Sequence, residues 1–227
     1  NDTSKIIRPT YLAGHSVGYI TSLVFAKIIT PQDAVSIVQE RGRLMTDACR
    51  SNPGTMIALL KPKTAEVEVL RQRLGLGGNH NSESEFILSG PNEKIAKALK
   101  EIRQKSLAAK VIEDIGVEGG FHSGCMGSVL DPLAKFIKPI PFLDPDPSIT
   151  IIGNSRAQII KTGDAAKQEL IDHICLPVLW HESMESLCEM GVTSFIEVGN
   201  GEVLSNNLKR DFKDGITIYT LHSLIKK

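Results

Sequence analysis

The chain of 227 residues carries 26 Lys and Arg against 26 Asp and Glu, and 41% of its residues are hydrophobic. This composition suits a folded core and offers no basic excess for a nucleic-acid partner. No apolar run approaches the roughly 18 to 20 residues that cross a bilayer, and no signal peptide begins the chain, so we expect a cytoplasmic protein with no membrane partner.

The first elements are a short strand, a glycine-rich turn and an apolar helix, expected at residues 10–13, 14–18 and 19–29. The following helix has clear start signals. Thr30 can cap it, Pro31 suits its first position, and Asp33 suits the positive end of the helix dipole. We expect this second helix to end near Cys49.

A different pattern begins at Gly54. Segments typical of strand, helix, strand, strand, helix and strand follow at residues 55–60, 64–74, 75–81, 84–90, 93–105 and 108–116. This order is that of a ferredoxin-like unit. The sequence therefore predicts a small inserted subdomain at residues 54–117, and an α/β catalytic subdomain made of residues 1–53 and 118–227.

The remainder of the chain alternates helices with strands. A glycine-rich turn, a helical stretch, a proline-rich loop, a strand, two helices and two strands are expected at residues 119–128, 129–137, 138–148, 149–154, 165–174, 177–190, 194–198 and 216–221. Strands that alternate with helices form mostly parallel sheets. The predicted fold class is thus α/β, with a mostly parallel sheet in an α/β-hydrolase-like large subdomain.

The segment GHSVG matches the G-x-S-x-G turn that holds a nucleophilic serine between a strand and a helix. Its glycines permit a sharp turn that exposes the hydroxyl of Ser16 at a helix N-terminus. The N–H of Val17 could then face a developing oxyanion. The alternative is a chance match in an ordinary strand-to-helix connection.

A nucleophilic serine needs a base, and the chain has six histidines. His15 is adjacent to the serine and is expected to line the site. His80 and His181 are expected to be solvated. His122 lies in a glycine-rich turn directly before a helix, which favours access to its ring. His222 remains a rival, because ordinary α/β-hydrolases place their histidine late in the chain.

Arg41 is the only charge on one face of the second predicted helix. That face consists of Ala34, Val38, Arg41, Met45 and Ala48 at helical spacing. A guanidinium turned toward a core needs an anionic partner, because it does not lose its proton. A buried carboxylate, an escape of the side chain to water and a substrate carboxylate are all compatible with this pattern.

Other cofactor signals are weak. The cysteines show no C-x-x-C spacing and are expected to be neither metal ligands nor disulfides; they are Cys49, Cys125, Cys175 and Cys188. The glycines of EVGNGEVL match neither nucleotide-binding loop pattern. We therefore expect no metal and no bound nucleotide cofactor.

Taken in order, several segments resemble the malonyl-CoA:acyl-carrier-protein acyltransferases of fatty-acid and polyketide synthesis. They are GHSVG at 14–18, RGRLM at 41–45, GTMIAL at 54–59, FILSG at 86–90, FHSGCM at 121–126, GNS at 153–155, LPVLWHESMESL at 176–187 and FIEVGNGEVLSNNLKR at 195–210. The last two are long and specific, and together the segments span nearly the whole chain.

This resemblance implies roles for single residues. Ser16 would be the nucleophile, His122 its general base, and Arg41 the partner of the malonyl carboxylate. The main-chain carbonyl of His173, at a position where the family usually has glutamine, would orient the base. Further substrate-binding positions would be His15, Val17, Phe121 and Asn154.

The resemblance also implies malonyl-CoA as substrate and an acyl carrier protein, with its phosphopantetheine thiol, as partner; a polyketide or fatty-acid synthase is compatible as a further partner. No permanently bound cofactor is expected. Two alternatives stay open: an acyl hydrolase of the same fold, and an incomplete module that only binds a carrier protein or another chain.

Departures from the family concern its first segment and a few side chains. The family's glycine-glutamine-glycine motif, which completes the oxyanion hole, does not precede Ser16, so we expect that the N-terminal segment of such a domain is lacking. Tyr19 and Glu85 replace residues usual in the bacterial fatty-acid enzymes. Phe121 resembles the residue of malonyl-selective polyketide domains.

Overall fold

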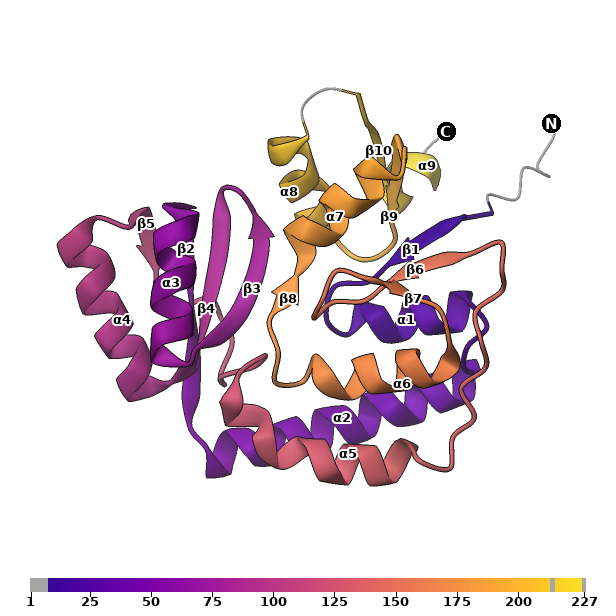
Figure 1. The fold of residues 1–227 in the computed structure, drawn as a ribbon, viewed down its shortest axis with the longest axis horizontal. Helices are drawn as coiled ribbons and strands as arrows, with labels where there is room; N and C mark the ends of the chain where they lie inside the picture. Colours follow the sequence, from indigo (N-terminus) through magenta and orange to yellow (C-terminus); the bar gives the residue numbers. More distant parts are fainter. Residues whose placement is uncertain (1–7, 213–214, 226–227) are drawn as a thin grey trace.

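The computed structural model describes residues 8–212 and 215–225, which form a large α/β part and a smaller part made of one sheet and two helices (Figure 1). In the large part, β1 (Tyr11–Ala13) pairs in parallel with β6 (Thr150–Ile152), and β6 pairs antiparallel with β7 (Ile159–Ile160). A second parallel pair joins β9 (Ser194–Glu197) to β10 (Thr217–Thr220). The pairs β1–β6 and β9–β10 are parallel as expected, whereas β7 was not predicted.

The first two helices begin where the sequence indicates, but the first ends early. Helix α1 (Gly18–Phe25) stops because Lys27 adopts a left-handed conformation with φ of 57° and the Ile28 N–H donates to the Leu23 carbonyl. These are features of a helix C-terminal cap. Helix α2 (Pro31–Ser51) starts at the expected cap, where the Thr30 hydroxyl oxygen accepts a hydrogen bond from the Asp33 N–H.

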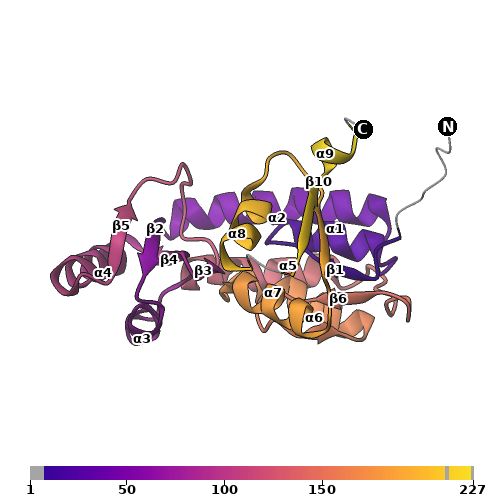
Figure 2. The ribbon, with the colours of Figure 1, turned by 90° about the horizontal axis from the view of Figure 1, so that it is seen from above.

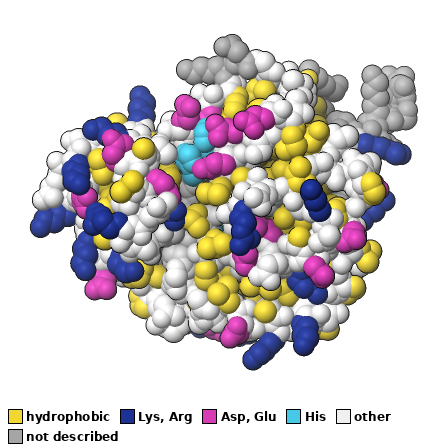
Figure 3. Space-filling view, viewed as in Figure 1, with side chains coloured by type: hydrophobic (Ala, Val, Ile, Leu, Met, Phe, Trp, Pro, Cys, Tyr) yellow, Lys and Arg dark blue, Asp and Glu magenta, His cyan; other side chains and the backbone are white. Residues whose placement is uncertain are grey.

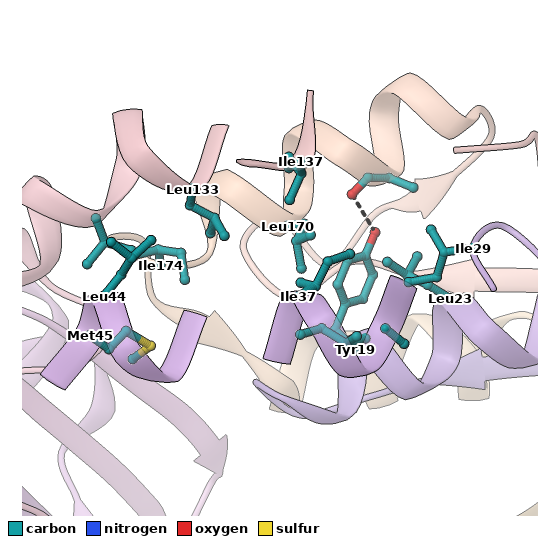
Figure 4. Close-up of a cluster of buried hydrophobic side chains, with 14 of the residues drawn as sticks. Tyr19, Leu23, Ile29, Ile37, Leu44, Met45, Leu133, Ile137, Leu170 and Ile174 are labelled. Carbon is teal, nitrogen blue, oxygen red and sulfur yellow. Dashed lines mark hydrogen bonds between the residues drawn. The ribbon is translucent and has the colours of Figure 1, made fainter. Parts of the chain in front are cut away.

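The core of the large part lies between helices. It joins α1 and α2 to α5 (Leu130–Ile137), α6 (Gly163–Asp172) and the short 3-10 helix η1 (Gly124–Val129). Figure 4 shows Tyr19 in this core, surrounded by aliphatic side chains, with its hydroxyl donating to the Ala166 carbonyl of α6. This packing fixes α1 and α6, which border the candidate site together with α2.

The sheet of the smaller part, called the small sheet, has five strands in the order β5-β2-β4-β3-β8, of which β8 is Val178–Leu179. Its elements are β2 (Gly54–Pro62), α3 (Thr64–Leu74), β3 (Gly77–Ser82), β4 (Glu85–Pro91), α4 (Asn92–Lys105) and β5 (Ala108–Ile112). The strands β2, β3, β4 and β5 pair antiparallel, and side chains of α3 and α4 share one buried cluster with side chains of β2, β4 and β5. Figures 1 and 2 both place α3 and α4 at the end of the molecule away from α1.

The segment 177–190 differs from the single helix that was expected. Residues Val178–Leu179 form strand β8, which pairs in parallel with β3, and only then does α7 (Trp180–Glu189) begin. The small sheet is thereby continuous with the large part, and the division at residues 54 and 117 stays a proposal.

Two further helices, α8 (Val203–Asp211) and α9 (Leu221–Ile225), complete the described elements. None of the helices in the described ranges combines the length and hydropathy that a bilayer crossing requires.

Candidate active site

The turn between β1 and α1 holds Ser16 in a left-handed conformation, with φ of 52°. The Gly18 and Tyr19 N–H groups donate to the carbonyls of His15 and Ser16, at 2.9 and 3.0 Å, and so start the helix directly behind the serine. A Cβ on Gly14 would lie 2.1 Å from the Gly18 carbonyl oxygen. The glycine is therefore what lets strand and helix approach so closely.

Asn154, in the turn after β6, clamps this loop from the opposite side. Its Oδ1 accepts from the Ser16 N–H at 2.7 Å, and its Nδ2 donates to the Gly14 carbonyl at 2.8 Å. Its own carbonyl accepts from the Leu179 N–H at 2.8 Å. Only 3% of Asn154 is exposed, so the geometry favours a positioning role over the substrate contact expected from the sequence.

The Oγ of Ser16 lies 2.9 Å from Nε2 of His122, and Nδ1 of His122 lies 2.6 Å from the His173 carbonyl oxygen. A carbonyl only accepts, so Nδ1 carries the proton and the bare Nε2 faces the serine hydroxyl. Burial above all, and then the neighbouring His173 and Arg41, hold the pKa of His122 well below its ordinary value. The ring is thus neutral and can accept a proton.

The loop that carries His122 is tightly packed against β3. His122 has a φ of 54°, and its carbonyl accepts from the Gly78 N–H at 3.0 Å. A Cβ on Gly77 would lie 1.8 Å from that same carbonyl oxygen. The small sheet therefore fixes the base through two glycines at the start of β3.

His173 contributes both a carbonyl and a buried ring. The ring lies 5.9 Å from that of His122, centroid to centroid, and its Nδ1 donates to the Glu169 carbonyl at 3.0 Å. Burial, reinforced by the charge of Arg41, lowers the pKa of His173 to about 3. The predicted carbonyl is in reach of the base, and the side chain stays neutral.

Arg41 reaches the serine from α2, with its Nη2 donating to the Ser16 Oγ at 3.1 Å. The residue is 8% exposed, and its Nε has no hydrogen-bond partner in the described structure. No carboxylate among the described residues pairs with it, whereas the exposed Arg43 pairs with Glu40 and Asp47. Burial lowers the pKa of Arg41 to about 10. On the predicted stripe Val38 is 40% exposed instead of buried.

The remaining predicted positions surround the dyad formed by Ser16 and His122 in different ways. The ring of His15 is held by Asn81, whose Oδ1 lies 2.9 Å from its Nε2, and burial lowers the pKa of His15. Val17 is 47% exposed, and within the described residues its N–H donates no hydrogen bond. Phe121 packs against the core next to the base. Among these described positions, Val17 is the exposed one, and its main-chain N–H stays free beside Ser16.

Two histidine predictions were wrong and a third falls outside the described side chains. His80 and His181 are buried, and they pair with Glu182 and Asp211, both at 2.7 Å. Figure 3 shows histidine side chains among acidic ones between the small sheet and the large part. The side chain of His222, the rival base, is not among the described residues.

Sequence reasoning missed three polar residues that support the site. Asn81 holds His15, and the buried pair of Ser155 and Glu169 lies directly behind Asn154. Ser155 belongs to the segment GNS at 153–155, which resembles the acyltransferase family, and this was the one feature of the sequence that pointed to it.

Comparison with known proteins gives a consistent result. The family model described as acyl transferase domain matches residues 3–227. The malonyl CoA-acyl carrier protein transacylase of Staphylococcus aureus (strain MRSA252) is 31% identical over 216 residues, which are 92% of this chain and 69% of that protein.

Solved structures are similar over the same extent. An acyl carrier protein S-malonyltransferase from Vibrio cholerae is 26% identical with a TM-score of 0.89, covering 97% of this chain and 73% of the other. A malonyl-transacylase in complex with its type II PKS acyl-carrier protein is 26% identical with a TM-score of 0.84, covering 96% and 72%. These matches confirm the predicted α/β fold class.

Proposed function

Because the chain belongs to the acyl transferase domain family, we propose that it moves a malonyl group from coenzyme A to the phosphopantetheine thiol of an acyl carrier protein. The group would pass through an ester on Ser16. The relatives named above support the substrates, and the contacts of Ser16, His122 and Arg41 support the roles of the residues.

In the first half-reaction, Ser16 attacks the thioester carbonyl while its proton passes to Nε2 of His122, 2.9 Å away. The His173 carbonyl stabilises the imidazolium that forms, because it already accepts from Nδ1. The Val17 N–H, at the start of α1, is the donor for the oxyanion. The thiolate of coenzyme A leaves with the proton from His122, and a malonyl ester remains on Ser16.

The second half-reaction is the reverse with a different thiol. The phosphopantetheine thiol gives its proton to His122 and attacks the ester, and Ser16 recovers its proton as it leaves. A thioester is consumed and a thioester is formed, so the transfer is close to balanced in free energy. Both half-reactions use the same dyad, and neither needs a permanently bound cofactor.

The observation that carries the choice of acyl group is the buried Arg41. A buried guanidinium without an anion is costly, and Arg41 has no carboxylate partner in the described chain. Its Nη2 already lies 3.1 Å from the Ser16 Oγ, where the acyl group is attached. We assign the malonyl carboxylate to this guanidinium, since its fork of donors suits bidentate pairing.

We also propose the cytoplasm as the compartment. The four cysteines are free, and Cys125 is buried. Unpaired cysteines suit a reducing compartment.

The decisive measurement is intact-protein mass spectrometry after mixing the chain with malonyl-CoA, followed by addition of a phosphopantetheinylated carrier protein. We expect a malonyl adduct on Ser16 that moves to the carrier protein, and no adduct on Ser16→Ala. Release of free malonate in place of transfer would favour a hydrolase. A folded wild-type chain that never gains the adduct would point to a module that only binds.

A further inference from the structure

The turn that clamps the nucleophile is itself held by a buried carboxylate. This turn, residues 153–155, contacts Ser16 and Gly14 through Asn154. Behind it lies Glu169 of α6, which is 4% exposed. Oε1 of Glu169 accepts from the Ser155 N–H at 2.7 Å, and Oε2 accepts from the Ser155 hydroxyl at 2.6 Å.

The turn is shaped to admit this carboxylate. A Cβ on Gly153 would lie 2.9 Å from Cδ of Glu169 and 3.2 Å from its Oε2. No basic side chain of the described residues pairs with Glu169, so the two bonds from Ser155 are what compensate its burial. A buried acceptor with two short bonds to one residue fixes that residue strongly.

The main chain of the same glutamate reaches the base. The Glu169 carbonyl accepts from the His173 N–H and from the His173 ring Nδ1, both at 3.0 Å. The His173 carbonyl in turn accepts from Nδ1 of His122. One residue is therefore connected to the nucleophile through its carboxylate and to the base through its carbonyl.

We propose that Glu169 is a positioning residue that sets Ser16 and His122 at hydrogen-bond distance. This role rests on the proposed function, in which the two side chains form the reacting dyad. Small displacements of reacting groups reduce rates steeply, and a misplacement of 1 Å can cost about 100-fold. Without this glutamate the turn 153–155 would lose its buried connection to the C-terminal end of α6, and the remaining pair of Arg156 with Asp172 lies at the surface.

The test compares variants at both ends of the contact. Glu169→Leu removes both acceptors at similar volume, and Ser155→Ala removes one donor and leaves the main chain intact. Asp172→Asn is the matched control, since Asp172 lies on the same helix and its carboxylate pairs with Arg156 of the same loop, but at the surface.

Two readouts separate positioning from loss of fold. The first is the rate of malonyl transfer divided by the number of serines that a fluorophosphonate labels. Only folded chains with a reactive serine are labelled, so unfolded protein does not enter this rate. We expect this rate to fall about 10- to 100-fold in Glu169→Leu and several-fold in Ser155→Ala. KM for malonyl-CoA should stay within about threefold of the wild-type value, because Arg41, which binds the malonyl carboxylate, lies on α2 and not on α6. The double variant Glu169→Leu/Ser155→Ala should be no slower than Glu169→Leu alone, because both substitutions remove the same contact. Asp172→Asn should match the wild type.

The second readout is the rate constant of fluorophosphonate labelling, which requires only Ser16 and His122. If the wild type labels but transfers no malonyl, the proposed function fails and the effect of Glu169 on labelling still decides the positioning role. An unchanged rate per labelled site in Ser155→Ala and in folded Glu169→Leu overturns the role. If Glu169→Leu does not fold, a wild-type transfer rate per labelled site in Ser155→Ala is enough to overturn the positioning role. The role is also overturned if Asp172→Asn loses as much of this rate as the variants of the buried contact.

Discussion

A fixed positive charge acts in opposite ways on the two members of the Ser16–His122 pair. The guanidinium of Arg41 donates to the Ser16 Oγ, which favours the serine when it carries negative charge. The same charge disfavours protonated His122 and adds to the lowering of its pKa that burial begins. A substrate carboxylate on Arg41 would neutralise this charge and so remove the part of the lowering of the His122 pKa that Arg41 causes, while the larger part caused by burial would remain.

Replacement of Arg41 should therefore change the choice of acyl group more than the capacity for transfer. We expect Arg41→Ala to lower the preference for malonyl-CoA over acetyl-CoA by about 10- to 100-fold, since a hydrogen bond to a charged group contributes about 1.5 to 3 kcal/mol. Competition between the two thioesters, read by the masses of the adducts on Ser16, measures the ratio.

Arg43→Ala is the control for this prediction. It removes an arginine of the same helix whose partners Glu40 and Asp47 lie at the surface. It should leave the ratio unchanged. An Arg41→Ala variant that keeps the wild-type ratio would make Arg41 a structural residue.

Local spacing was sufficient to single out Ser16 and Arg41 as candidates, because the turn motif and the helical face consist of neighbouring residues, whereas the role of Arg41 stayed open until the family resemblance was added. His122 required the family resemblance, since six histidines compete and the serine lies 106 positions away. The burial of His80 and His181 was not predicted, because their sequence neighbours are polar and the carboxylates that pair with them lie far away in the chain. Glu169 carried no local signal, as its side chain and carbonyl act on different loops.

At the scale of elements, the site depends on how closely β1 and α1 approach at Gly14. We predict that Gly14→Ala slows labelling of Ser16 by at least about 10-fold and lowers the free energy of unfolding by about 1 to 3 kcal/mol, because the new methyl meets the rigid main chain of Gly18. Fluorophosphonate labelling and urea unfolding measure the two effects.

The same substitution in an open place provides the comparison. A Cβ on Gly42 of α2 would meet no neighbouring group within 4 Å, so Gly42→Ala should label at the wild-type rate and unfold at slightly higher urea. Equal behaviour of the two variants would contradict the close approach at Gly14.

Element boundaries followed the sequence where caps and glycines mark them. Thr30 and Pro31 start α2 as the pattern indicated, and α3 ends at the predicted Leu74, where Gly75 is left-handed and not yet part of the strand expected from residue 75. Strand β8 was not predicted, because its two residues are extended only through their pairing with β3, which lies far away in the chain. Such pairing is set by tertiary contacts that a local pattern does not contain.

At the scale of the molecule, the site lies where the small sheet meets the large part. The nucleophile belongs to the β1–α1 turn, the base to the loop packed on β3, and the orienting carbonyl to the end of α6. The parts are joined by β8 and by buried polar residues, His173 and Glu169 among them. The positions of Ser16 and His122 thus depend on buried groups such as His173, which must stay uncharged in the folded protein. The stability of the fold therefore depends on pH, because such a group binds a proton more readily in the unfolded chain.

The pH dependence of stability follows from the neutral, fully buried His173. Its pKa is about 3 in the folded chain and about 6.5 when unfolded. Between these values the unfolded chain binds the extra proton, so the free energy of unfolding falls as the pH drops below about 6.5, by up to about 1.4 kcal/mol per pH unit for this group. Above about pH 8 both states are unprotonated at His173, so the group contributes almost no slope. We predict that His173→Gln, whose amide can still donate to the Glu169 carbonyl, flattens the decline between pH 6 and pH 4.5. Urea unfolding across this range measures it; an unaltered slope would show that other groups, His122 first, carry the acid sensitivity.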